Sequence, residues 1–186
     1  MKLSTLTGAM ITIALAATSV AVSAAEADKG HGVITFKGSI IDSPCTIAQE
    51  SQYQTIEMDQ VSNVALKDGG KSIPTPFRIQ LRGCELGSIK TATATFTGPP
   101  SFANSDMLAL NGTAKGVSLG IADNKGDLIK LGSASPAQSL SNGDTYLQFQ
   151  AYLQGDQTTP EKGDPVAAVI VPGDFETFAN FTLAYQ

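Results

Sequence analysis

The residues able to carry catalysis or bind a metal are few in this chain. It has one histidine, His31, and two cysteines, Cys45 and Cys84. A Ser/His/Asp triad would have to use His31, and no Gly-x-Ser-x-Gly elbow is present. A copper or zinc centre on a secreted β-sandwich needs several imidazoles. We therefore expect no enzyme, no cofactor and no metal, with paired carboxylates as the alternative that the sequence leaves open.

The stretch Asp123-Asn124-Lys125-Gly126-Asp127 offers oxygen ligands to calcium. A full calcium loop of about twelve residues ends in a glutamate, and this stretch lacks both the length and the glutamate. It lies between the apolar runs Val117 to Ile121 and Leu128 to Leu131. Asp, Asn and Gly at such a place favour a hairpin turn.

The first two dozen residues have the pattern of an export signal. Lys2 gives a short positive region, and residues 6–22 are mostly apolar and uncharged. Small residues then offer cleavage after Ala24 or Ala25. A membrane-spanning helix is the alternative, but the flanks and the alanine-rich end favour cleavage. We therefore interpret residues 1–24 as a signal peptide and expect the mature chain to be exported.

Export places Cys45 and Cys84 in an oxidising compartment. A single disulfide closing a loop of about forty residues would stabilise the fold by roughly 3–4 kcal/mol in the chain-entropy model. Two free thiols, or a metal site built on them, are the alternatives. The scarcity of other metal ligands favours the disulfide.

The charge of the mature chain argues against two classes of partner. The whole chain has 12 basic and 17 acidic residues, so loss of Lys2 leaves 11 − 17 = −6. Nucleic acid and anionic lipid surfaces both attract basic patches. We therefore expect neither as a partner.

Most of the mature sequence alternates with a period of two. In the run Thr91 to Thr97, hydroxyl residues alternate with apolar ones. Between Tyr146 and Leu153, one face is apolar and the other carries tyrosine and glutamine. Phe77, Ile79 and Leu81 alternate with polar residues and lead to Cys84. Such runs predict strands with one buried and one wet face.

Two further features complete the fold prediction. Residues 166–171 form a continuous apolar run ended by Pro172-Gly173, which predicts a deeply buried strand. No stretch shows a long helical apolar stripe. Short strands separated by turns predict an all-β fold of the β-sandwich type.

Both ends of the mature chain are amphipathic strands by pattern. In the N-terminal run the even positions form one face: Gly32, Ile34, Phe36, Gly38 and Ile40. In the C-terminal run the odd positions form one face: Ala179, Phe181, Leu183 and Tyr185, followed by Gln186. On pattern alone, these are two edge strands of a closed sandwich.

The mature sequence resembles the subunits of chaperone–usher pili, in particular the major pilins of P-type and type 1 fimbriae. The resemblance is carried by the stretch Thr35-Phe36-Lys37-Gly38-Ser39-Ile40-Ile41-Asp42-Ser43-Pro44-Cys45, by Cys84 after an alternating strand, and by the ending 179–186. Gly173, fourteen residues from the end, and the penultimate Tyr185 also match the family pattern. Each motif is weak by itself, but their order and spacing together are specific.

The resemblance implies an incomplete immunoglobulin-like β-sandwich that lacks its last strand and is completed in trans by a donor strand. The implied domains are residues 1–24 as signal peptide, 25–40 as donor-strand extension and 41–186 as the pilin domain. The missing strand leaves an apolar groove beside the C-terminal strand. An exposed groove and sheet edge would promote aggregation.

The resemblance also implies the partners. A periplasmic pilus chaperone lends a strand to the groove, contacts Phe181, Leu183 and Tyr185, and holds the Gln186 carboxylate with basic residues. At the outer-membrane usher, a neighbouring pilin then inserts its extension, with Ile34, Phe36 and Ile40 in the groove and Gly38 where a side chain would not fit. The product is a homopolymer, a fimbria on the bacterial surface that supports adhesion.

Other functions remain as alternatives. A minor adaptor or a terminating pilin would have the same pattern as a major one. A closed immunoglobulin-like binding module would need another strand after Tyr185, and we expect none. Tip adhesins of the family are about twice as long, because they carry a receptor-binding domain ahead of the pilin domain.

Overall fold

A computed structural model describes residues 32–158 and 164–186 of the 186-residue chain. The chain divides into two units, residues 1–40 and 41–186, and each is described by itself. The predicted signal peptide lies outside the described residues. In the described part, no helix is both long and apolar enough to span a membrane.

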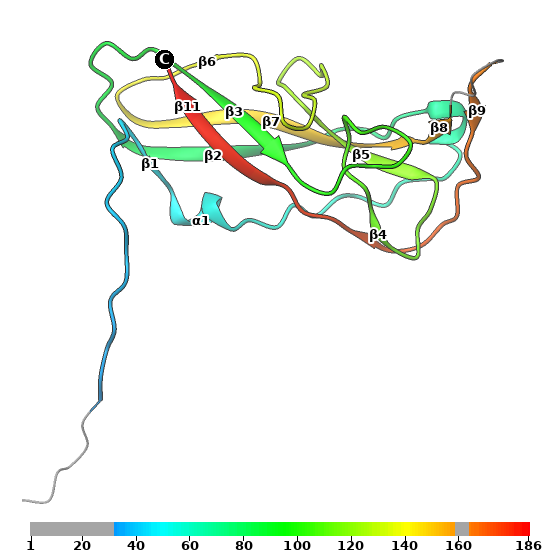
Figure 1. The fold of residues 1–186 in the computed structure, drawn as a ribbon, viewed down its shortest axis with the longest axis horizontal. Coiled ribbons are helices and arrows are strands. Elements are labelled where there is room, and N and C mark those ends of the chain that lie inside the picture. The colour runs from blue at the N-terminus through cyan, green and yellow to red at the C-terminus, as the bar shows by residue number, and fades with distance from the viewer. Residues whose placement is uncertain (1–31, 159–163) are drawn as a thin grey trace, which may run out of the picture. The chain divides into compact units, whose positions relative to one another are not determined.

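In its described residues, the second unit consists of strands with one α-helical and one 3-10 turn, which confirms the predicted all-β fold (Figure 1). The helical elements are α1 (Gln49–Gln52) and the 3-10 helix η1 (Lys67–Gly69). The strands are β1 (Thr46–Ile47), β2 (Thr75–Cys84), β3 (Thr91–Thr97), β4 (Asn111–Gly112), β5 (Val117–Ala122), β6 (Gln138–Ser139), β7 (Gly143–Gly155), β8 (Gln157–Thr158), β9 (Val166–Ala167), β10 (Phe175–Glu176) and β11 (Asn180–Tyr185).

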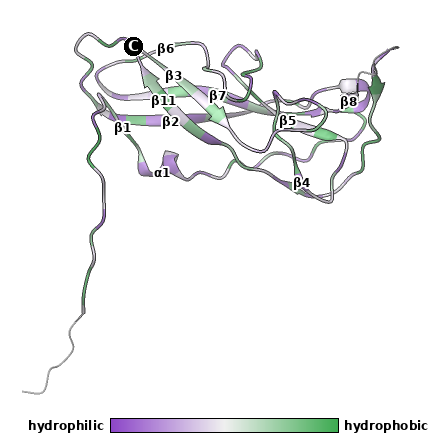
Figure 2. Cartoon of the chain, viewed as in Figure 1, coloured by the Kyte–Doolittle hydropathy of each residue, from purple (hydrophilic) through white to green (hydrophobic). Residues whose placement is uncertain are grey.

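The larger sheet has the order β1-β2-β7-β5, and all its neighbours are antiparallel. Apolar and polar residues alternate along β2 and β7, as Figure 2 shows. Because side chains of successive residues point to opposite faces, Phe77 and Ile79 of β2 lie opposite Phe149 and Leu147 of β7 on the core face. The strands predicted at Phe77–Leu81 and Tyr146–Leu153 are therefore confirmed.

The smaller sheet has the order β11-β3-β6. Its central strand β3 has the bounds expected from sequence, and its Ala92, Ala94 and Phe96 are buried. Short ladders β10–β4 and β8–β9 extend the structure beyond the two sheets. Six residue pairs join β3 to β11, so this strand fixes the position of β11.

Three phenylalanines, one from the smaller sheet and two from the larger, meet in the core. Phe96 and Phe149 lie with ring centroids 5.0 Å apart in an edge-to-face arrangement, and Phe77 lies 5.7 Å from Phe149 and 6.2 Å from Phe96. Such pairs add roughly 0.5–1.5 kcal/mol each beyond the burial of their area. The trio therefore ties β3 to β2 and β7.

The stretch 123–127 forms the predicted turn. The Asp123 carboxylate accepts hydrogen bonds from the amides of Lys125 and Asp127 at 2.8 and 3.0 Å. Turn chemistry thus accounts for this aspartate, and no cluster of three or more potential metal ligands occurs in the described residues. The predicted partner run after the turn is not a full strand, because only a bridge at Leu128 and one amide bond from Ile129 pair it with β5.

The prediction of a buried strand over residues 166–171 is wrong. Only Val166 and Ala167 form a strand, and Val166, Val169 and Val171 are 59%, 83% and 45% exposed. Ile170 packs against the core while its neighbours point outward. The run is apolar throughout, but the described chain supplies a covering layer for one side of it only.

The face of Tyr152 was also predicted wrongly. This tyrosine lies on the polar face of β7 by alternation, yet it is 3% exposed. Met107, from the segment after β3, packs with Tyr152 and Ala122 in a second small apolar cluster. The segment that carries Met107 covers this end of the polar face of β7, so Tyr152 is buried there.

Candidate functional site

Strand β11 has a partner on one side only. Six residue pairs, from Asn180–Thr97 to Tyr185–Ala92, join it to β3 in antiparallel register. No strand of the described residues pairs with its other side. The outer edge of β11 is therefore a row of backbone groups available to an added strand.

The side chains of β11 are buried incompletely. Phe181, Leu183 and Tyr185 pack against the core but are only half-buried, and the residues between them are exposed. In β7, which has a neighbour on each side, the corresponding apolar residues are 0–6% exposed. Since both strands alternate in the same way, the difference reflects the missing neighbour of β11.

The end of the chain is anchored on β3. The backbone oxygen of Gln186 accepts hydrogen bonds from the amides of Lys90 and Thr91 at 2.7 and 2.9 Å, and the Gln186 amide donates to the Thr91 oxygen at 2.9 Å. These bonds continue the β3 ladder to the last residue. They hold the half-buried side chains of β11 in a fixed row.

Gly173 has a steric role in the approach to β11. A Cβ at this position would overlap the Thr113 side chain and lie 2.7 Å from the Ala114 nitrogen. The Asp174 amide donates to the Thr113 hydroxyl at 3.0 Å. The segment leading to β11 thus lies directly on the backbone around β4, and only glycine fits at 173. Ala179, at the other end of this approach, is exposed just before β11 begins.

A second unpaired segment, residues 54–61, was missed by the sequence reasoning. Within the described chain, its backbone makes no hydrogen bond to another backbone group. Its apolar side chains Ile56, Met58 and Val61 are half-buried, and Met58 and Val61 pack against the same core as β11. The alternation of Ile56 and Met58 with polar residues was the available signal, but it spans only two apolar positions.

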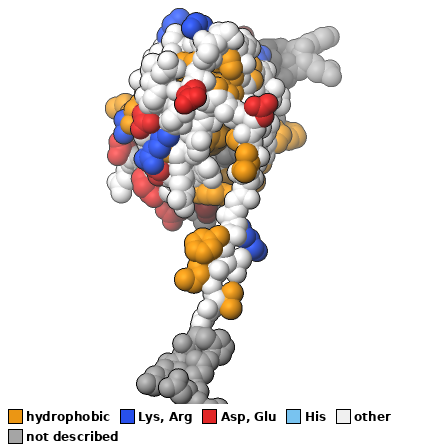
Figure 3. Space-filling view, turned by 90° about the vertical axis from the view of Figure 1, so that its left-hand side faces the viewer, with side chains coloured by type: hydrophobic (Ala, Val, Ile, Leu, Met, Phe, Trp, Pro, Cys, Tyr) orange, Lys and Arg blue, Asp and Glu red, His pale blue; other side chains and the backbone are white. Residues whose placement is uncertain are grey.

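The extension segment, defined as residues 32–40, has no regular secondary structure. Ile34, Phe36 and Ile40 are 78%, 89% and 103% exposed, and Figure 3 shows hydrophobic side chains standing out along this segment. No described atom lies within 4 Å of a Cβ built at Gly32 or Gly38. The described residues of the chain therefore give no steric reason for glycine at 38.

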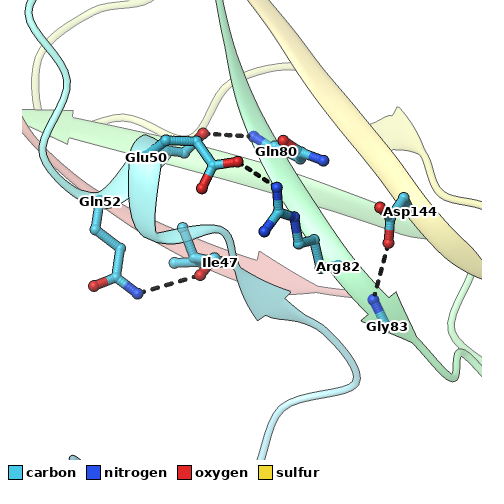
Figure 4. A network of polar contacts seen from close by, with 8 residues as sticks. Ile47, Glu50, Gln52, Gln80, Arg82, Gly83 and Asp144 are labelled. Carbon is cyan, nitrogen blue, oxygen red and sulfur yellow. Dashed lines mark hydrogen bonds and ion pairs between the residues drawn. The ribbon is translucent and has the colours of Figure 1, made fainter.

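The root of the extension is fixed to β2. Cys45 and Cys84 form the predicted disulfide, and β1 pairs with β2. Figure 4 shows how α1 adds to this attachment through an ion pair between Glu50 and Arg82. The segment that follows the extension is thus held rigidly on the larger sheet.

Neighbouring polar contacts complete the attachment in Figure 4. The Gln80 amide donates to the Ser51 hydroxyl at 3.0 Å, and the Gln52 side chain donates to the Ile47 oxygen at 3.2 Å. On the far side of β2, the Gly83 amide donates to Asp144 at 3.4 Å. Ser51 is buried, so its bond to β2 is shielded from water and favours one position of α1.

Comparison with known protein families assigns the chain. A family model described as fimbrial protein matches residues 34–186. The chain belongs to the fimbrial protein family. The match includes both the even-numbered face of the extension from Ile34 onward and the whole of β11, the strand that has a partner on one side only.

Relatives agree with this fimbrial assignment. The chain is 52% identical over 160 residues to the Fimbria A protein of Serratia marcescens, covering 86% of this chain and 87% of the relative. It is 41% identical over 177 residues to the major MR/P fimbria protein of Proteus mirabilis strain HI4320, covering 95% and 96%. A chain in a solved chaperone–usher pilus is 31% identical, with a TM-score of 0.69 and coverage of 86% and 98%.

The family, the relatives and the fold identify a structural subunit of a chaperone–usher fimbria, assembled on the cell surface by way of the periplasm. Its fold is that of these pilins, an immunoglobulin-like sandwich lacking a strand. Its partners are neighbouring pilins and the pilus chaperone and usher that deliver them.

Proposed function

We propose that the chain is the major subunit of its fimbria and that its extension segment fills the unpaired edge of β11 in the next copy. The observation that carries the proposal is that two segments have incomplete and complementary surroundings. One segment exposes apolar side chains with period two, and the other presents a free edge above half-buried side chains with the same period. Strand addition would bury the apolar side chains of the extension and would give the free edge of β11 a hydrogen-bonded neighbour.

The donor face is Ile34, Phe36, Gly38 and Ile40, with Gly32 at its outer end. Because directly opposed residues of paired strands point to the same face, these side chains would enter the core beside Phe181, Leu183 and Tyr185. Burial of three large side chains contributes a gross gain on the order of 5–9 kcal/mol before the costs of ordering. Backbone hydrogen bonds along the edge add to this, so the junction should dissociate slowly.

The half-buried side chains also explain the need for a chaperone. Phe181, Leu183 and Tyr185 beside a free sheet edge form a surface prone to aggregation before assembly. A chaperone strand covers this surface in the periplasm, with basic residues near the Gln186 carboxylate. In this proposal the mature chain comprises a donor-strand extension at residues 25–40 and a pilin domain at residues 41–186.

The role is structural and not enzymatic. The named relatives are fimbrial subunits, and strand addition explains both the exposed apolar face of the extension and the free edge of β11. The one histidine, His31, precedes the donor face and needs no part in the mechanism.

The test is to isolate fimbriae from cells that make this chain and to measure its share of fibre protein. We expect it to be the predominant component, with density for a strand from one copy along β11 of the next. A trace amount in intact fibres would favour an adaptor or a terminating subunit. Fibres in which β11 has no added strand would overturn the mechanism.

A further inference from the structure

The wrongly predicted run 166–171 raises the question of what covers its side chains. Val166, Val169 and Val171 are exposed, and Val64, in the turn just before η1, is 65% exposed. A hollow of about 240 Å³ lies between the two segments, lined by Asn63, Lys67, Asp68 and residues 167–170. We name the four valines the valine patch. Exposed apolar clusters of this kind mark surfaces for another molecule more often than isolated apolar residues do.

The valine patch lies along the approach to β11. From β9, the chain continues through a bridge between Val171 and Lys115, then β10, to the start of β11. Figure 1 shows this path, orange to red, running from the end that holds β8 and β9 toward the C-terminus at the opposite end of the domain. The first residues of β11 therefore point back toward the patch.

A donor strand on β11 has a defined direction if it pairs in the more stable antiparallel sense. Its first residues then lie near Tyr185, and Ile40 lies near Ala179. Beyond Ile40, the donor copy has only residues 41–44 before Cys45, which its disulfide and β1 hold on β2. The five steps from Ile40 to Cys45 reach at most about 18 Å, so the donor's domain must begin close to the start of the acceptor's β11.

The donor's domain is large enough to reach from the start of the acceptor's β11 to the valine patch. Ala179 and Val169 are ten residues apart, at most roughly 35 Å along the chain. A domain of 186 − 40 = 146 residues has a radius of gyration of about 15 Å, and so is roughly 40 Å across. A domain tethered within about 18 Å of Ile40 spans this interval when it lies along the acceptor's C-terminal segment.

We infer that the valine patch of one copy is a second docking surface for the next copy, whose disulfide-bearing end with Cys45 packs against it. The donor's Ile41, which follows the inserted segment and is 65% exposed, faces the same junction. This inference rests on the proposed strand addition. It adds a contact between the two folded domains, so that the junction is a rigid joint and not a strand on a free tether.

The test uses fibres of the full mature chain carrying Val169→Asp, with Phe102→Asp as the matched control. Phe102 is fully exposed and Val169 is largely exposed, so both substitutions place a charge on the surface. Phe102 lies outside the valine patch. Junction lifetime is measured as the rate at which fibres dissociate in denaturant. We expect about tenfold faster dissociation for Val169→Asp and a rate like that of the unaltered chain for Phe102→Asp. Equal rates for the two variants would overturn the inference.

A synthetic peptide of residues 32–41 separates this inference from the proposed function. The peptide has no domain to dock, so it should bind the Val169→Asp subunit as well as the unaltered subunit. Loss of peptide binding only in the variant would show damage to the acceptor edge and overturn the inference. Failure of the peptide to bind the unaltered subunit would instead contradict the strand addition on which both rest.

A photoreactive residue placed at position 169 gives a direct readout of the occupant. We expect crosslinks to residues 41–48 or to the neighbourhood of Cys84 in an adjacent copy. Crosslinks only to another region of the neighbour, or only to a chaperone, would contradict the assigned contact.

Discussion

The extension segment and β11 have the same alternation of apolar residues but opposite structural states. β11 lies on β3, and its apolar side chains are half-buried. The extension has no strand partner among the described residues, and its apolar side chains are 78–103% exposed. Alternation therefore specifies which face is apolar, while the number of neighbouring strands decides how far that face is buried.

This difference in burial also distinguishes the donor segment from the acceptor strand. β11 contributes to the domain's own core, so damage to it should affect folding as well as assembly. The extension contributes nothing to the described core, so damage to it should affect assembly alone. Variants on the two segments can test this distinction.

Leu183→Asp should have the largest effect. It places a carboxylate on the half-buried row that packs against the core, and burial of an unpaired charge costs several kcal/mol in typical sites. We expect low periplasmic yield, no binding of the 32–41 peptide and no fibres. Normal peptide binding by a folded Leu183→Asp subunit would contradict the role of β11 as the acceptor.

Phe36→Asp should prevent the extension from inserting into a neighbouring copy, while β11 of the same subunit should still bind a donor strand. The loss of one buried aromatic side chain, roughly 1.5–3 kcal/mol, shortens the junction lifetime by about 10- to 100-fold even before the charge is counted. The folded domain should keep its stability with chaperone bound and should still bind the 32–41 peptide. Thr35→Asp, on the opposite face, is the matched control and should form fibres. Normal fibres from Phe36→Asp, seen by electron microscopy, would show that the donor face is wrong.

Gly38→Leu should also block assembly, for a steric reason. Nothing in the described chain crowds this position, so the variant subunit should fold and bind chaperone normally. In the neighbour's groove, the added side chain would meet a packed surface, and overpacking typically costs about 1–3 kcal/mol. Fibres of normal length and stability would refute the placement of Gly38 in a tight part of the groove.

Cys45→Ser should act on stability more than on assembly. Loss of the disulfide removes roughly 3–4 kcal/mol in the chain-entropy model and loosens the root of the extension. We expect a lower yield of the chaperone-bound subunit and an earlier unfolding transition in denaturant. Cys84→Ser should match it, because either change breaks the same bond, and unchanged yield in both would argue against a structural bridge.

Much of the domain could be predicted because its strands bury one face each. Along β3, small apolar residues alternate with threonines, and the predicted bounds match the structure. The same reasoning succeeded for β2 and β7. Apart from Tyr152 in β7, the apolar positions of these strands are the ones that face the core, because both sheets contribute to it.

The errors arose where burial depends on distant segments. Tyr152 is interior because Met107 covers it, whereas the valines of 166–171 are exposed although Ile170 of the same run packs against the core. Neither outcome is encoded in the local period. The donor and acceptor roles depended on the family resemblance for the same reason, since their burial is completed by a different molecule.

The most direct test of the central claim is the addition of the 32–41 peptide to the mature subunit released from its chaperone. We expect a stable one-to-one complex that no longer aggregates, with backbone amides of β11 protected from hydrogen exchange along its outer edge. A subunit that stays monomeric and folds reversibly without the peptide, and shows no added protection of β11 in its presence, would contradict the account.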